Sequence, residues 1–219
     1  MSPRTRTPLT RDRVLAAALE LADTRGIEDL TMRKLAKELG VEAMSLYNHV
    51  RNKEALLAGM VDIVFGEIEV AEPGTGPWRD AMHGRAHSLR AALNRHPWAI
   101  GLMEGRAYPG PHNIRYHNAV VGCLREGGFA FRNAIHAMSA QDAYIYGFAL
   151  QERGLPFETP EESSAVMDSH VAQVADTTPY PYLVEVATEL QKSGYDYAVE
   201  FEFGLNLILD ALEPLRSAG

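Results

Sequence analysis

The chain has 219 residues, of which 46% are hydrophobic, and a formal net charge of −8. Its single cysteine excludes a disulfide within the chain. No run approaches the roughly 18 apolar residues of a membrane-spanning helix, and no apolar segment follows the basic N-terminus as a signal peptide would require. We therefore expect a soluble protein of the cytoplasm.

The charge is unevenly distributed along the chain. Residues 1–60 contain ten Lys and Arg against eight Asp and Glu, whereas the remaining residues contain eleven against twenty-one. A basic module beside an acidic body is typical of a protein that contacts phosphate at one end. We predict two domains, with residues 1–60 contacting phosphate and residues 61–219 forming a larger second domain.

Apolar residues recur at helical spacing through almost the whole chain, which predicts an all-α fold. A first helix should begin after Thr10 and end at Gly26, and a second should begin after Thr31 and end at Gly40. The stretch VEAMSLYNHVRNKEALL, residues 41–57, follows after a short turn. Two short helices joined by a glycine-containing turn are typical of a helix-turn-helix motif.

The second domain is predicted to be helical throughout. Its helices are expected at residues 53–69, 78–94, 112–126, 132–152, 182–192 and 195–213. Residues 153–181 are polar and bounded by prolines, so we expect at most one short helix there.

The second helix of a helix-turn-helix enters the major groove of DNA. Here Leu46 and Val50 are spaced for the core, and the polar side chains between them face outward. Basic and hydrogen-bonding groups are suited to phosphate contacts, and small groups to base edges. The predicted phosphate contacts are Arg33, Tyr47, His49 and Lys53, the base-edge contacts are Ala43, Met44 and Ser45, and Thr31 and Asn48 complete the set. The alternative is a surface helix whose polar face is only solvated.

The stretch GIEDLTMRKLAKELGVEAMSLYNHVRNKEALL resembles the DNA-binding domain of the tetracycline-repressor (TetR) family, over roughly residues 10–60. A weaker resemblance continues to FEFGLNLILDALE near the C-terminus. The resemblance implies an all-helical homodimer with an N-terminal three-helix operator-binding domain and a C-terminal domain that binds a small inducer and dimerises. We expect a repressor that binds a palindromic operator and is released by its inducer.

The last two predicted helices carry more apolar surface than a small core requires. Pairing them with a second copy would bury this surface in a four-helix interface. The predicted interface residues are Leu190, Phe201, Leu205 and Ile208. A purely internal role for these helices is the alternative.

The helix from Trp78 carries an apolar stripe that Arg85 interrupts. A buried cation needs a partner, so Arg85 is either an anchor for an acidic or carbonyl-rich ligand or part of an internal ion pair, for instance with Glu104. Its long side chain reaching water is a third possibility. The predicted ligand-binding residues are Arg85, Leu89, Met103, Arg106, Tyr116, His117, Val120, Gln141 and Tyr144.

The resemblance also bears on the inducer. In the tetracycline binders of the family, histidines, an asparagine and a glutamine hold the drug and its magnesium ion. Those positions correspond here to Glu69, Arg85, Met103 and Val120. Because a thioether is a poor ligand for a hard cation, we expect an inducer other than magnesium-bound tetracycline, flatter or more lipophilic, with an acidic or carbonyl group near Arg85 or Arg106.

His83 and His87 are four residues apart and could in principle share a metal ion. No cysteine or carboxylate stands at matching spacing, so we predict no metal site and no cofactor. No catalytic constellation can be assigned either, and we predict that the protein is not an enzyme. Two alternatives remain: an enzyme or metal-binding protein with an incidental helix-turn-helix, and a regulator whose second domain binds another protein.

Overall fold

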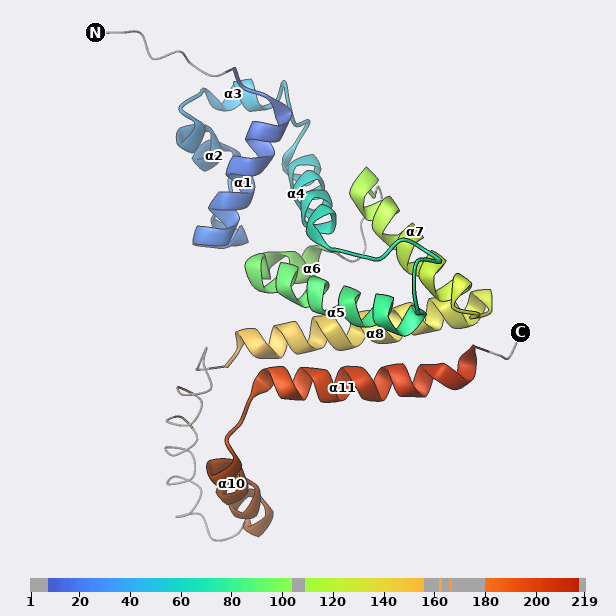
Figure 1. The fold of residues 1–219 in the computed structure, drawn as a ribbon. Coiled ribbons are helices and arrows are strands. Elements are labelled where there is room, and N and C mark those ends of the chain that lie inside the picture. Colours follow the sequence, from blue (N-terminus) through green and yellow to red (C-terminus); the bar gives the residue numbers. More distant parts are fainter. Residues whose placement is uncertain (1–7, 104–108, 156–161, 163–165, 167–179, 217–219) are drawn as a thin grey trace.

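The computed structural model describes residues 8–103, 109–155, 162, 166 and 180–216. Within these ranges the chain forms helices and no strand, which confirms the all-α prediction. Three N-terminal helices form a small unit, α4 leads away from it, and the helices after α4, apart from α10, form a larger bundle (Figure 1). No helix in the described ranges is long and apolar enough to cross a membrane.

The first two helices begin and end where the sequence predicts. α1 (Arg11–Arg25) begins after Thr10, whose hydroxyl accepts a hydrogen bond of 3.2 Å from the main-chain N–H three residues further on. α2 (Met32–Leu39) begins after Thr31 with the same 3.2 Å capping bond. Gly40 ends α2 in the left-handed region, at a φ of 67°, where glycine is least strained.

α3 (Ala43–Leu46) is shorter than the predicted second helix of the motif. The helical pattern tightens at Tyr47, whose N–H donates to a carbonyl three residues earlier rather than four. Leu46 and Val50 are buried as expected, so the polar segment between them is anchored to the core at both of its ends. α4 (Lys53–Glu67) then connects this unit to the bundle.

The bundle consists of α5 (Trp78–Arg95), α6 (Ile100–Met103), α7 (Pro111–Glu126), α8 (Phe131–Arg153) and α11 (Tyr197–Leu212), and α10 (Pro181–Ser193) stands apart from it (Figure 1). α5 packs against α7, α8 and α11, and α8 and α11 lie side by side (Figure 1). The short α6 was not predicted, because four residues are too few to show helical periodicity. The short helix expected within residues 153–181 falls almost entirely outside the described residues.

Trp78 connects the start of α5 to later parts of the bundle. The indole ring of Trp78, at the start of α5, packs edge-on against Phe129 with 4.8 Å between ring centroids. Its Nε1 donates a 3.1 Å hydrogen bond to Glu213, just after α11. The start of α5 is therefore fixed to the end of α11, which limits how these two helices can move relative to each other.

Candidate DNA-binding surface and ligand-binding domain

The predicted DNA contacts of residues 43–49 lie on or near the surface of the N-terminal unit. The side chain of Met44 is 75% exposed and that of Tyr47 is 44% exposed. Asn48 is also exposed, and Ala43, Ser45 and His49 are half-buried at the edge of the same segment. Because neighbouring Leu46 is fully buried, it fixes the backbone that carries these exposed groups.

The predicted phosphate contacts surround this segment. Arg33 on α2 and Lys53 at the first position of α4 are both exposed. The Oδ1 atom of Asn52 caps α4 by accepting a 2.7 Å hydrogen bond from a main-chain N–H, so the start of α4 is well ordered next to Lys53. Thr31 uses its hydroxyl for the α2 cap. Arg51, not predicted as a contact, is exposed beside Lys53 and adds positive charge at the same place.

Arg85 lies at the centre of a buried polar cluster between α5, α7 and α8. Its side chain is 1% exposed, and its Nε donates to the Tyr116 hydroxyl at 2.7 Å. One terminal nitrogen donates to Gln141 Oε1 at 2.9 Å, and the other forms an ion pair with Asp142. The structure therefore supplies an internal ion-pair partner, Asp142, in place of the suggested Glu104, which lies outside the described residues.

The charge of Arg85 is stabilised despite its burial. Burial alone would lower the pKa of the guanidinium, but the pKa is raised by Tyr116 and by the carboxylate of Asp142. One polar atom of the cluster is left over: Gln141 Nε2 is buried and has no hydrogen-bond partner among the described residues. An unpaired buried donor costs about 1–3 kcal/mol. One further acceptor bonded to Gln141 Nε2 would remove this cost.

The other predicted ligand-binding residues differ in their burial and in their partners. Leu89, Met103 and Val120 are buried, and Tyr116 is a direct partner of Arg85. His117 is half-buried and directs its Nδ1 at its own helix, 2.9 Å from the carbonyl of Asn113. The Tyr144 hydroxyl donates to the carbonyl of Phe201 at 2.8 Å, which turns it toward α11. Arg106 lies outside the described residues.

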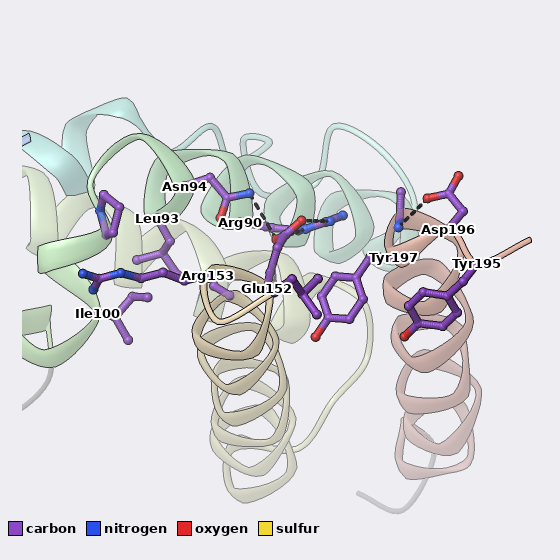
Figure 2. Close-up of a pocket in the computed structure, with 13 residues that line it drawn as sticks. Arg90, Leu93, Asn94, Ile100, Glu152, Arg153, Tyr195, Asp196 and Tyr197 are labelled. Carbon is purple, nitrogen blue, oxygen red and sulfur yellow. Dashed lines mark hydrogen bonds and ion pairs between the residues drawn. The ribbon is translucent and has the colours of Figure 1, made fainter. Parts of the chain in front are cut away.

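A separate cavity of about 650 Å³ lies between the ends of α5 and α8 and the start of α11 (Figure 2). Leu93, Ile100, Tyr195 and Tyr197 are among its lining residues, as are Arg90 and Glu152, which form an ion pair. Burial opposes the charge of Glu152, but hydrogen bonds from Arg90 and Asn94 lower its pKa. None of the predicted ligand-binding residues lines this cavity.

The Arg85 cluster is connected to α4 through aromatic packing. The ring of Tyr116 lies against Phe65 of α4, with 5.2 Å between ring centroids. A second link joins α4 to the start of α7, where the N–H of Asn113 donates to Asp62 at 3.0 Å. A change at the cluster can therefore reach α4, the helix that carries the N-terminal unit.

An open groove of about 1200 Å³ lies between α1, α4 and the start of α7.

Two of the residues predicted near the dimer interface are buried inside the protomer. Phe201 and Leu205 are fully buried within the protomer, because they hold α11 against α5 and α8. Ile208 and Leu190 are half-buried. The opposite side of α11 is apolar and exposed instead, and consists of Val199, Phe203 and Leu207. The spacing of four residues places these three side chains on one face.

Comparison with known proteins places both parts of the chain. Residues 14–60 match the family described as bacterial regulatory proteins, tetR family, and residues 70–216 match the tetracyclin repressor-like C-terminal domain. The chain is 32% identical over 216 residues to the HTH-type transcriptional repressor DrrR1 of Streptomyces coeruleorubidus, covering 94% of this chain and 78% of that protein. It is 30% identical over 212 residues to the class A tetracycline repressor of Escherichia coli, covering 96% and 93%.

Solved structures show the same fold. ActR from Streptomyces coelicolor in complex with actinorhodin is 29% identical, with a TM-score of 0.78 and coverage of 97% of this chain and 100% of that one. A TetR variant from Acinetobacter baumannii AYE in complex with minocycline is 27% identical, with a TM-score of 0.75 and coverage of 96% of each chain. The chain belongs to the TetR family of bacterial regulatory proteins and is a ligand-responsive transcriptional regulator.

Proposed function

We propose that this protein is a cytoplasmic, homodimeric repressor that reads two half-sites of a palindromic operator and is released by a small molecule other than magnesium-bound tetracycline. Residues 1–60 are the DNA-binding domain, and residues 61–219 bind the inducer and dimerise. The observation that carries the proposal is the exposed surface of the motif, where Met44 and Tyr47 project while Leu46 is buried. Such a segment suits the major groove.

The exposed apolar face of α11 supports dimerisation. Phe203 is 64% exposed, and Val199 and Leu207 lie on the same face. The adjacent α8 exposes small side chains, Ala140 and Ala143, over which a bulky residue of a second copy can pack closely. In place of the predicted pairing through α10 and α11, we propose that α8 and α11 of two protomers form a four-helix interface, which would place two N-terminal units on one DNA molecule.

The Arg85 cluster is the proposed inducer anchor. Gln141 Nε2 is an unpaired buried donor, and a carbonyl or phenolate oxygen of the inducer would satisfy it beside the Arg85 charge. Leu89, Met103 and Val120, the other buried residues of the predicted set, are apolar and favour a lipophilic molecule. They also argue against a hydrated magnesium ion, which prefers oxygen ligands and would be repelled by Arg85.

Release from DNA requires that the inducer bind one conformation better than the other. An inducer oxygen at Arg85 and Gln141 would compete with Tyr116 for the guanidinium. Because Tyr116 packs on Phe65, its displacement would move α4 and change the separation of the two DNA-binding units. In this proposal the inducer acts on the DNA-binding unit through α4, which begins at Lys53.

Gln141→Met tests the anchor, because it keeps the side-chain volume and removes the unpaired donor, together with the acceptor of one Arg85 hydrogen bond. A thermal-shift screen of small aromatic compounds on the wild-type protein identifies a binder, which raises the melting temperature by mass action. We expect Gln141→Met to lower the affinity for that compound by about tenfold and to leave the protein folded. Tyr197→Ala is the matched change in the cavity of Figure 2.

Two outcomes discriminate between the sites. Loss of affinity in Gln141→Met alone supports the Arg85 cluster. Loss in Tyr197→Ala alone would place the inducer in the 650 Å³ cavity, which is the second candidate because it is already open and of ligand size. If no compound releases the protein from a selected operator, the inducer proposal fails.

A further inference from the structure

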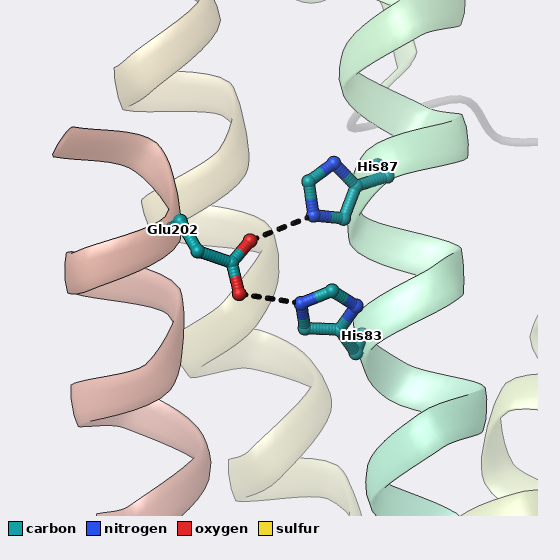
Figure 3. Close-up of side chains that lie close together, drawn as sticks. All are labelled: His83, His87 and Glu202. Atoms are coloured by element: carbon teal, nitrogen blue, oxygen red, sulfur yellow. Dashed lines mark hydrogen bonds and ion pairs between the residues drawn. The ribbon is translucent and has the colours of Figure 1, made fainter. Parts of the chain in front are cut away.

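Three potential metal ligands meet where α5 contacts α11 (Figure 3). His83 and His87 are one turn apart on α5, so both rings extend from one side of the helix, and Glu202 reaches them from α11. Their ligating atoms all lie within 4.8 Å of one another. We propose that these three side chains bind a zinc ion, and that the ion ties α5 to α11.

The distances between the ligand atoms are close to those that zinc requires. His83 Nε2 lies 2.7 Å from one carboxylate oxygen of Glu202, and His87 Nε2 lies 3.0 Å from the other. With zinc–ligand bonds of about 2.0–2.2 Å, two ligands of a tetrahedral ion are roughly 3.3 Å apart. The nitrogen and oxygen atoms therefore need to move apart by a few tenths of an ångström to admit the ion. Small rotations of these partly exposed side chains provide that movement.

The surrounding residues hold the ligands in place. Asn206 Nδ2 donates to the carboxylate of Glu202 at 2.7 Å, and Asn206 in turn accepts a 2.9 Å hydrogen bond from Arg79. The ring of His87 packs edge-on against Phe201, with 5.3 Å between centroids. Such outer contacts commonly orient metal ligands.

The ligand set selects the type of ion. Two imidazoles and one carboxylate suit zinc and similar transition-metal ions, whereas magnesium and calcium prefer oxygen ligands alone. The side chains of His83, His87 and Glu202 are 37%, 44% and 41% exposed, so the ion can enter and water can complete its coordination. Without a metal, the same residues form two hydrogen bonds to one carboxylate, which is the alternative.

The site is distinct from the DNA-binding surface and from the Arg85 cluster. It joins α5 to Glu202 of α11, and Glu202 is not one of the residues of the proposed dimer surface, Val199, Phe203 and Leu207. A bound ion would therefore stabilise the α5–α11 contact without touching the recognition segment. Its effect is expected on the stability of the bundle rather than on base preference.

Calorimetric titration of the untagged, chelator-treated full-length protein with zinc chloride tests the proposal. We expect one zinc ion per chain at micromolar affinity and a higher melting temperature with zinc, but neither effect with magnesium. His83→Gln, His87→Gln and Glu202→Gln keep hydrogen-bonding groups and should each weaken zinc binding by at least about tenfold. His136→Gln, an exposed histidine on α8, is the matched control and should bind zinc as the wild type does.

Cobalt provides a second readout that does not depend on stability. The wild-type protein loaded with cobalt should show the visible absorption of a four-coordinate ion, and the three variants should lose it. Zinc affinity unchanged in all three variants would overturn the proposal, because the ion would then bind elsewhere. Absence of saturation up to about 100 μM zinc would overturn it as well, and would leave the histidines as hydrogen-bond partners of Glu202.

Discussion

His96 Nδ1 lies 2.8 Å from Asp23 Oδ1, although the two residues belong to different parts of the molecule. Asp23 is on α1 of the N-terminal unit, and His96 is a buried residue directly after α5 of the bundle. The other ring nitrogen of His96 is 3.1 Å from Glu67, at the end of α4, and Trp98 donates a 2.6 Å hydrogen bond to the same Asp23 oxygen. This junction fixes the orientation of the DNA-binding unit on the bundle.

Replacing Asp23 should loosen that junction. Asp23→Ala leaves the N–H of Trp98 and one nitrogen of His96 without their acceptor, so we expect the free energy of unfolding to fall by about 1–3 kcal/mol. Operator affinity should fall with it, while base preference stays the same. Urea denaturation and fluorescence anisotropy measure the two effects. Glu20→Ala, an exposed acid on the same helix, is the control, and equal behaviour of the two variants would contradict the proposed role.

Lys53 and the small residues of the recognition segment should differ in their effect on DNA binding. Lys53→Ala removes one phosphate contact, so it should weaken binding to all sequences similarly and reduce the salt dependence by about one ion. Met44→Ala and Ser45→Ala should change base preference instead. Binding to a library of operator variants at several salt concentrations separates these effects, with Lys192→Ala on α10 as control. A change of base preference in Lys53→Ala, with unchanged salt dependence, would show that the roles are misassigned.

The exposed side of α11 should determine the oligomeric state. Phe203→Glu places a charge in the proposed interface, where its burial is unfavourable, so the variant should be monomeric at concentrations at which the wild type is a dimer. Ile114→Glu, an equally drastic change at an exposed position on α7, should leave the dimer intact. Light scattering gives the mass of each. A dimeric Phe203→Glu protein would refute the interface.

The ion pair of Arg85 should contribute strongly to stability. Asp142→Ala leaves a buried guanidinium without its anionic partner, which should cost about 3–5 kcal/mol of unfolding free energy. The double variant Arg85→Met, Asp142→Ala removes both charges, so it should be more stable than Asp142→Ala alone. Chemical denaturation of the three proteins forms the test. If the double variant is the least stable of the three, the burial of the charge is not the cause.

Tetracycline should not bind, with or without magnesium. The buried Met103 and Val120 offer neither a hard ligand for the ion nor a hydrogen bond, and each missing polar contact costs about 1–3 kcal/mol. Following the fluorescence of the drug during titration with the protein measures any binding. Saturation at low micromolar tetracycline would show that the proposed anchor and its apolar surroundings are wrongly assigned.

Local features of the chain were predictable because their causes are local. Thr10 and Thr31 cap helices by bonding to main-chain groups three residues away, and Gly40 ends α2 in a conformation that glycine favours. The motif of the N-terminal unit follows from these signals and from the spacing of Leu46 and Val50. Distant residues have little influence on any of them, so the sequence alone determined that this end of the protein is a helix-turn-helix.

The tertiary structure decided which groups meet across helices. Sequence spacing identified Arg85 as a buried cation but could not identify Asp142 as its partner, and it paired His83 with His87 without finding Glu202, more than a hundred residues away. On α11, Phe201 and Phe203 are equally apolar, and helical periodicity cannot tell which of two apolar faces is covered. Packing against α5 and α8 buries Phe201 and leaves Phe203 exposed, because the two side chains lie on different faces of α11 and the neighbouring helices cover only one of them.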